Sequence, residues 1–408
     1  MAIGSAGDLF PMLKVALALR ERGHRISFLG PEQHRPYVEL AGLRFHGVAV
    51  DEAVLDDPRL WDPRHGFGVV WRATRGAAAA LLDFVDALPT GEACVLLVHP
   101  LALPEADLCR AARPDIRIAA VYLAPSNLPT VHDPLIMGPV RVPRWVPLRA
   151  RRWLWRRVGR QLVDPVVLPG VNRQRRLRGM PPVRSALPYL FQVPDLSLAL
   201  FPAWFAPTQP DWPKPLLRGD FPLYDPAPAT PFSPELAAFL ADGEAPVVFT
   251  PGTGNRQAAA YFRAALAAVV NLRRRAIFLT PHQHQLPPDL PASVLWQAYV
   301  PLRALLPDTA GLVHHGGIGT TAEGLRSGIP QLVVPFAHDQ FDNAARVTAL
   351  GVGSTLPAAR MSAVRLQRHL RRLLSSRAVA VTSRAVATRF GASPDLDTIC
   401  AALLTLPL

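Results

Sequence analysis

A glycine-rich segment with two histidines lies between an apolar run and a helical pattern in the second half of the chain. It reads His314-His315-Gly316-Gly317-Ile318-Gly319-Thr320-Thr321-Ala322-Glu323. Small residues let a backbone approach a ligand, and the first turn of a helix offers unpaired N–H groups and a positive dipole end to an anion. The pattern predicts a diphosphate site made by His315, Gly317, Gly319 and Thr320. The alternative is a glycine-rich turn that binds nothing.

Polar side chains suited to sugar hydroxyls follow the same segment. Asp339 and Gln340 come after the next apolar run and combine a carboxylate acceptor with an amide that both donates and accepts. Glu323, two helical turns beyond His315, would face a ribose hydroxyl. Phosphate, ribose and sugar contacts in this order predict a site for a nucleotide sugar.

The elements that must position these residues are parallel α/β units. Apolar runs alternate with helical patterns, which is typical of a doubly wound parallel sheet. The runs are 26–29, 43–48, 94–98, 116–123, 247–250, 276–280, 294–299, 311–314 and 331–334. We therefore predict an α/β fold with two Rossmann-like domains facing a cleft.

A proline-rich stretch separates the two halves. Residues 202–234 contain ten prolines, and proline removes backbone donors, so we expect an extended connector outside any sheet. The predicted organisation is an acceptor-binding domain at 1–205, a connector at 206–235 and a donor-binding domain at 236–408, whose last helix can cross back to the first domain.

At the start of the chain, only Met1 to Ile3 precede the first glycine turn. We expect either a start assigned a few codons late or a short strand that loses some sheet pairing.

The donor segment resembles that of the inverting, metal-independent GT-B glycosyltransferases, the family of the UDP-glucosyl and UDP-glucuronosyl transferases. The matching positions are 313–323, 328–330, Pro335 and Asp339-Gln340. The resemblance implies that His315 and Thr320 contact the diphosphate, Glu323 the ribose, and Asp339 with Gln340 the transferred sugar.

The base site is less closely matched. Tyr299-Val300-Pro301 stands where plant members carry Trp-x-Pro beneath the base, so a stacking face is kept while base preference stays open. Thr250, Gly252 and Thr253 are expected to form a loop near the donor, where Thr253-Gly254 departs from the family pattern and leaves the sugar open.

Other segments look most like the bacterial rhamnosyltransferase catalytic chain of rhamnolipid synthesis. They are 57–63, 201–207, 211–213 and 249–252. This resemblance implies transfer of L-rhamnose from dTDP-L-rhamnose to the hydroxyl of a hydroxy-fatty-acid ester, without a cofactor. The alternatives are a UDP-glucose enzyme acting on a small natural product or sterol-like alcohol, and a non-catalytic nucleotide-sugar-binding protein.

The acceptor side depends on the first glycine turn. An attacking alcohol must lose its proton, and Asp8 at the start of the first helix is the expected base, as in related transferases with a Gly-x-x-Gly-Asp start. The alternative is that Asp8 only caps the helix. Ser5 and His132 are weaker acceptor-side candidates, and a surface role for His132 is the other interpretation.

No metal is expected. Asp395-Leu396-Asp397 matches the Asp-x-Asp pair of another glycosyltransferase fold, but it follows Ser393-Pro394 and is more typical of a helix start. The helix N-terminus and His315 would offset the leaving-group charge instead.

The formal charge of +13 is concentrated in one segment. Residues 141–184 hold thirteen arginines and one acid, for a net charge of +12. A helix that begins at Leu148 would carry an apolar stripe and, beside it, a basic stripe. The apolar stripe consists of Leu148, Trp155, Val158 and Leu162. The basic stripe consists of Arg149, Arg152, Arg156 and Arg160. Such a helix can rest on an anionic membrane, or be a solvated face packed on the first domain. Nucleic acid is not expected as a partner, because no nucleic-acid-binding motif accompanies the arginines.

Composition favours a folded cytoplasmic protein. Half of the residues are hydrophobic, and three cysteines without a close pair fit neither a disulfide framework nor a zinc site. The first residues do not resemble a signal peptide, and the apolar stretches fall short of the ~18 residues that span a bilayer. We therefore expect a cytoplasmic location, with peripheral contact at the inner face of the membrane as an option.

Overall fold

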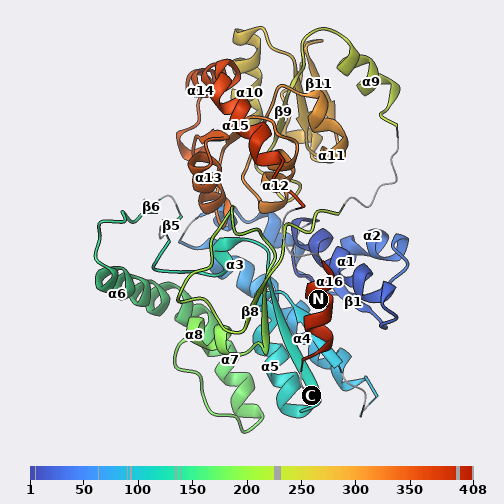
Figure 1. Ribbon diagram of the computed structural model, residues 1–408, viewed down its shortest axis with the longest axis vertical. Helices are drawn as coiled ribbons and strands as arrows, with labels where there is room; N and C mark the ends of the chain where they lie inside the picture. The colour runs from blue at the N-terminus through green and yellow to red at the C-terminus, as the bar shows by residue number, and fades with distance from the viewer. Residues whose placement is uncertain are drawn as a thin grey trace. The chain divides into compact units, whose positions relative to one another are not determined.

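The computed structural model describes residues 1–4, 6–62, 64–89, 91, 94–133, 136–138, 140–224, 231–391 and 396–406. The chain forms two compact units, one of Met1–Tyr224 with Ser393–Leu408 and one of Asp225–Ala392 (Figure 1). Both are built on parallel strands, so the predicted α/β fold class is confirmed.

The second unit contains a parallel sheet in the order β11-β10-β9-β12-β13-β14. Its strands are β9 (Val247–Thr250), β10 (Ala276–Leu279), β11 (Val294–Gln297), β12 (Gly311–His314), β13 (Gln331–Val333) and β14 (Gly353–Thr355). Its helices are α9 (Pro234–Ala241), α10 (Ala259–Leu272), α11 (Leu302–Leu305), α12 (Ile318–Arg326), α13 (Gln340–Ala349), α14 (Ala363–Ser375) and α15 (Arg377–Ala387). Helices α10 and α14 lie on one side of the sheet and α9 and α11 on the other (Figure 1).

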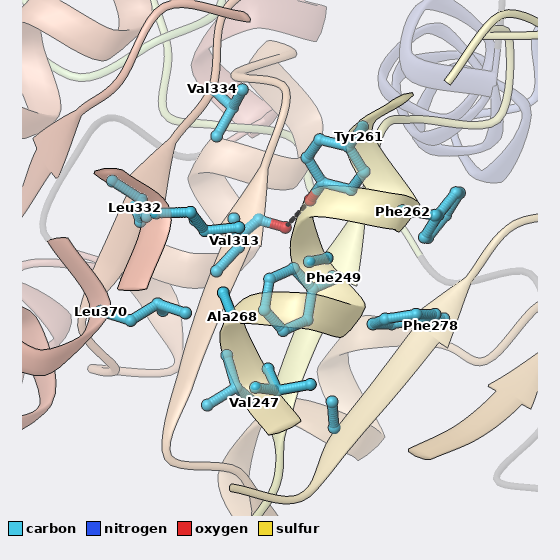
Figure 2. Packing of buried hydrophobic residues seen from close by; sticks show 14 of the residues in the cluster. Val247, Phe249, Tyr261, Phe262, Ala268, Phe278, Val313, Leu332, Val334 and Leu370 are labelled. Carbon is cyan, nitrogen blue, oxygen red and sulfur yellow. Dashed lines mark hydrogen bonds between the residues drawn. The ribbon is translucent and has the colours of Figure 1, made fainter. Parts of the chain in front are cut away.

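Alternating side chains of β9 fill two cores. Phe249 packs on Phe278 with ring centroids 5.5 Å apart, on the face covered by α10 and α14 (Figure 2). Val248 belongs to the cluster on the opposite face. Because both faces are covered, the strands read as continuous apolar runs in the sequence.

The first unit contains a parallel sheet β3-β4-β7-β8 and a parallel pair β1-β2. The strands are β1 (Ser27–Pro31), β2 (Arg44–Val48), β3 (Cys94–Val98), β4 (Ile116–Tyr122), β7 (Leu196–Ala199) and β8 (Leu216–Arg218), with a small antiparallel pair β5 (Ile136–Met137) and β6 (Val140–Arg141). The helices are α1 (Ala6–Glu21), α2 (Arg35–Leu40), α3 (Gly66–Ala73), α4 (Arg75–Asp86), α5 (Leu103–Ala112), α6 (Leu148–Val158), α7 (Asp164–Leu177), α8 (Ala186–Gln192) and α16 (Leu396–Leu404).

The first residues of the chain fill the gap between β1 and β3. The N–H of Ala2 donates to the carbonyl of Leu29 at 3.0 Å, and the N–H of His99 donates to the carbonyl of Met1 at 3.3 Å. Met1 to Ile3 are buried. They therefore link the two groups of strands through few hydrogen bonds.

The proline-rich stretch departs from expectation at one place. Residues Leu216–Arg218 form β8 and pair with β7, so the prediction that the whole stretch lies outside the sheets is wrong there. These three residues lack proline and keep their backbone donors. β8 is also an edge strand, where the neighbouring Pro215 is tolerated because its carbonyl still accepts from Ser197 at 3.0 Å.

The last helix of the chain belongs to the first unit. Helix α16 contacts α1, and Asp397 forms an ion pair with Arg22 of α1. Within the described part of the chain, no helix combines the length and apolarity needed to cross a bilayer.

Candidate active site

The turn between β12 and α12 is fixed by His314. This side chain is fully buried; its Nδ1 accepts from the N–H of Gly316 at 3.2 Å, and its Nε2 lies 3.0 Å from Oε1 of Gln331. Because Nδ1 accepts, the neutral ring carries its proton on Nε2. Burial lowers the pKa of His314 to about 3. The first histidine of the pair therefore holds the turn in shape.

The ring of His315 is wedged between two glycines. A Cβ on Gly252 would lie 2.7 Å from Cε1 and Nε2 of this ring, and a Cβ on Gly317 would collide with Nε2. Gly252 also has a φ of +88°, which favours glycine. Burial lowers the pKa of His315 to about 4, and the backbone of Thr250 offsets this in part. The predicted donor loop and diphosphate segment thus meet at one imidazole.

Helix α12 begins directly above this ring. Gly317 is its N-cap and supplies no side-chain cap, so the N–H groups of the first turn depend on other partners. The N–H of Thr321 already reaches the carbonyl of Gly317 at 2.9 Å. A Cβ on Gly319 would meet no atom within 4 Å, so there is open space beside the first turn. Thr320, also in this turn, is half-buried. The arrangement can hold an anion against amide donors.

A carboxylate from the next loop joins this group. The Nδ2 of Asn343 donates to Oδ2 of Asp339 at 2.8 Å and to the carbonyl of Gly316 at 2.8 Å. Burial raises the pKa of Asp339 to about 6. The hydrogen bonds that its carboxylate accepts from Asn343 and from the N–H of Ile318 lower the pKa and offset part of this rise. Asn343 therefore ties Asp339 to the glycine turn.

Gln340, predicted to read the sugar, is 4% exposed. Its Oε1 accepts from the N–H groups of Phe336 and Ala337 at 2.7 and 3.1 Å, which leaves the amide NH₂ as its available donor. The preceding residue, His338, is exposed and has a φ of +57°. This loop is strained next to the predicted sugar-binding residues.

The predicted ribose and base residues lie in different settings. Glu323 forms an ion pair with Arg326 one turn along α12. Tyr299 is 51% exposed, while Val300 is buried in the core. The carbonyl of Thr253 lies 3.2 Å from Nε2 of His282.

In the first unit, Asp8 lies in the first turn of α1, inside the helix and not at its N-cap. Its carboxylate covers Gly4, where an added Cβ would collide with Oδ2. Oδ1 lies 3.8 Å from Nε2 of His99, which follows β3. Asp8 thus shares its surroundings with a histidine.

The other acceptor-side candidates are less informative. The N–H of His132 donates to Oγ1 of Thr130, and its carbonyl lies 3.4 Å from the guanidinium of Arg151, so the backbone is held at His132 itself. Ser5 lies outside the described residues, as does Asp395. Within the described residues, no group of three or more His, Cys, Asp or Glu side chains could hold a metal ion.

The arginine-rich segment divides into two groups. Arg175 is 9% exposed and pairs with Asp107 at 2.6 Å, so it stabilises the fold. The basic stripe of Arg149, Arg152, Arg156 and Arg160 is exposed, and α6 contains no buried residue. Trp153 and Trp145 are 62% and 81% exposed. We use the name basic surface for α6, the two residues that follow it (159–160), and Trp145.

Sequence reasoning missed His99 and Asn343. His99 comes directly after an apolar run, where polar residues of parallel sheets gather. Asn343 lies one helical turn after Asp339. Both signals are present in the sequence, but each is too common to select a residue without the tertiary contacts.

Comparisons with known proteins agree with this architecture. The family described as erythromycin biosynthesis protein CIII-like, C-terminal domain, matches residues 263–406. O-mycaminosyltylonolide 6-deoxyallosyltransferase of Streptomyces fradiae is 31% identical, over 98% of this chain and 95% of its own length. Vancomycin aglycone glucosyltransferase of Amycolatopsis orientalis is 28% identical over 95% of this chain and 94% of its own.

Solved structures show the same fold. The glycosyltransferase of kitacinnamycin superposes with a TM-score of 0.72 at 20% identity, covering 99% of this chain and 97% of its own. Spinosyn rhamnosyltransferase, solved in complex with thymidine diphosphate, has a TM-score of 0.67 at 22% identity and covers 99% of this chain and 100% of its own.

Two parallel α/β units with a glycine-flanked histidine at a helix N-terminus define a glycosyltransferase of the GT-B fold. The chain belongs to the EryCIII-like family of these enzymes. The expected enzyme class is therefore confirmed. The relatives' names give no support to the link with rhamnolipid synthesis.

Proposed function

We propose that the protein transfers a 6-deoxyhexose from a dTDP-linked donor to a hydroxyl of a natural-product aglycone, inverting the anomeric centre without a metal. The observation that carries this is the placement of His315 between Gly252 and Gly317 at the start of α12, with Asp339 held beside the same turn by Asn343. Amide donors, an imidazole and a carboxylate together fit a diphosphate joined to a sugar.

This placement supports the following donor roles. The diphosphate would lie against His315, Gly317, Gly319 and Thr320, where developing negative charge meets the helix N-terminus. Asp339 would accept from a sugar hydroxyl, with the Gln340 amide as donor. Glu323 would accept from the 3′-hydroxyl of a thymidine, and Tyr299 would stack on the base.

Asp8 would act as the base. The acceptor oxygen forms a bond to the anomeric carbon while its proton moves to the Asp8 carboxylate. The bond from the anomeric carbon to the diphosphate oxygen breaks, and its electron pair leaves with the nucleoside diphosphate. Direct displacement of this kind inverts the anomeric centre.

The names of the relatives favour a deoxysugar and a natural-product acceptor. One relative transfers 6-deoxyallose, and a structural neighbour is a rhamnosyltransferase solved with thymidine diphosphate. Transfer of L-rhamnose from dTDP-L-rhamnose remains within this proposal. A hydroxy-fatty-acid acceptor and a UDP-glucose donor are the alternatives to be tested against it.

The test is nucleoside diphosphate release from dTDP-L-rhamnose, dTDP-6-deoxyallose, UDP-glucose and UDP-glucuronate, each with a macrolactone, a glycopeptide aglycone or a hydroxy-fatty-acid ester. We expect a dTDP-6-deoxyhexose with a natural-product aglycone to turn over at least about tenfold faster than any UDP-sugar, since one lost sugar contact costs about 1.4 kcal/mol or more. Turnover with the fatty-acid ester alone would favour the lipid alternative. No turnover with any pair would contradict the proposed transfer.

We also propose that the basic surface contacts an anionic membrane. Its arginines and tryptophans are exposed together, and no residue of α6 is buried. Each cation near an anionic bilayer contributes about 1 kcal/mol, and tryptophan favours the interface. The solvated-face alternative requires no partner.

Co-sedimentation with phosphatidylglycerol vesicles separates the two. Changing Arg149, Arg152, Arg156 and Arg160 to glutamine should weaken binding by about 10²-fold or more, given ~1 kcal/mol for each charge. The matched control changes the exposed Arg365, Arg368, Arg371 and Arg372 of α14, which carries no tryptophan, and should have little effect. Equal losses in both variants would show nonspecific charge attraction, and no binding by the unmodified protein would leave the surface solvated.

A further inference from the structure

Three polar side chains meet at the carboxyl edge of the first unit's strands. Asp8 extends from the first turn of α1 and covers Gly4. His99 follows β3. His34, 2% exposed, follows β1 beside the backbone of Gly4, and a Cβ on Gly30 would lie 2.9 Å from its Nδ1. His99 is therefore the imidazole that lies beside the Asp8 carboxylate, while His34 lies beside the backbone of Gly4.

The hydrogen bonds of His99 decide which of its nitrogens carries a proton. Nδ1 accepts from the N–H of Leu101 at 3.2 Å and so caps the turn at Pro100–Ala102. A ring nitrogen that accepts a hydrogen bond has no proton, so the neutral imidazole is protonated at Nε2. Nε2 is the atom that lies 3.8 Å from Oδ1 of Asp8. The two polar atoms of His99 thus have different tasks.

We propose that His99 is a positioning residue for Asp8: its Nε2–H faces Oδ1 of the carboxylate and orients the group that takes the acceptor's proton. The inference deepens the proposed function and rests on Asp8 being the base. The 3.8 Å separation is longer than a hydrogen bond and is expected to shorten when the acceptor binds, as is common for catalytic contacts.

His99 itself is a poor base in this arrangement. Its lone pair faces Leu101, and protonating Nδ1 would remove that hydrogen bond. Burial lowers the pKa of His99 to about 4, so the ring stays neutral near pH 7. The charged amino group of Met1 also acts on His99 and lowers its pKa further.

Two conservative substitutions separate the tasks of His99. In His99→Gln the amide nitrogen can replace Nε2 and donate to Asp8, while the acceptor for Leu101 is lost. In His99→Asn the amide oxygen can replace Nδ1 and keep the cap, while the donor to Asp8 is lost. His24→Asn, in an exposed position of the same unit, is the matched control.

We expect His99→Asn to lower kcat about tenfold with little change in KM, and to move the acid limb of the pH profile upward by about one pH unit, because the carboxylate loses a donor. His99→Gln should keep kcat within about threefold of the unmodified enzyme but lower the melting temperature, through loss of the cap. Equal losses in the two variants, or the greater loss in His99→Gln, would overturn the proposal.

A second measurement does not depend on turnover. Two-bond ¹H–¹⁵N spectra of histidine-labelled protein, with His99 assigned from the His99→Asn variant, report the tautomer directly. We expect the Nε2–H form, neutral down to about pH 5. An Nδ1–H form would overturn the proposal whatever the activity. If the tautomer is as expected but Asp8→Asn retains full activity, the base assignment fails and the placement of His99 stands.

Discussion

Asp8→Asn is expected to lower kcat by about 10² to 10⁴-fold, the usual contribution of a general base, while KM changes little. Asparagine has nearly the same shape and still fits over Gly4 in the first turn of α1, but it cannot take a proton. Steady-state kinetics with the preferred donor and acceptor pair measures the effect.

The melting temperature provides the control for this substitution. Asp8 lies within the first turn and not at the N-cap, so asparagine loses only the interaction of a negative charge with the helix N-terminus, about 0.3 to 1 kcal/mol, and stability should change little. Activity near that of the unmodified enzyme would show that Asp8 is not the base. A large loss of stability would instead indicate a structural role.

His315→Ala is expected to reduce kcat/KM by about 10² to 10³-fold, as for the loss of one donor from a site that stabilises developing charge. The imidazole fills the space between Gly252 and Gly317 beside the start of α12, and alanine supplies neither the donor nor the volume. His284→Ala, an exposed histidine of the same unit, is the control and should be without effect. A loss in His315→Ala no greater than in that control would exclude His315 from the diphosphate site.

The pH dependence of dTDP binding tests the same residue in another way. In the free protein the pKa of His315 is lowered to about 4, so the ring is neutral at pH 7. A diphosphate beside the ring favours the charged form and raises its pKa, so binding takes up a proton. Affinity should therefore rise as the pH falls toward 4, by up to about tenfold for each pH unit between the bound and free pKa values.

His315→Gln keeps a neutral donor and removes this titration. The ratio of affinities between the unmodified protein and His315→Gln, measured by calorimetry from about pH 8 to 5.5, cancels the ionisation of dTDP itself. A ratio that does not change with pH would show that the imidazole gains no proton on binding.

The donor segment was largely predictable because its signals are local. An apolar run, small residues and a helix start within a short stretch indicate where backbone donors will lie. The structure places β12 and α12 at Gly311–His314 and Ile318–Arg326, on either side of His315 as expected. What the pattern did not show is that His314 holds the turn by accepting from the N–H of Gly316.

The partnership of Asp8 with His99 could not be predicted in the same way. It depends on Met1 to Ile3 lying between β1 and β3, which brings the ends of α1 and β3 together. The order of strands in the folded sheet cannot be predicted from the hydrophobic periodicity of the sequence. The role of Asn343, which bonds to both Gly316 and Asp339, is nonlocal for the same reason.

The sequence by itself determined the α/β class, most strand positions and the residues at the helix start that can meet an anion, because burial on both faces and helix initiation depend on near neighbours. The tertiary structure decided which polar atoms remain available. Oε1 of Gln340 is used by the backbone of Phe336 and Ala337, and Nδ1 of His99 by Leu101. These hydrogen bonds depend on distances between elements of the folded chain. They determine which atoms of each side chain can still contact a substrate.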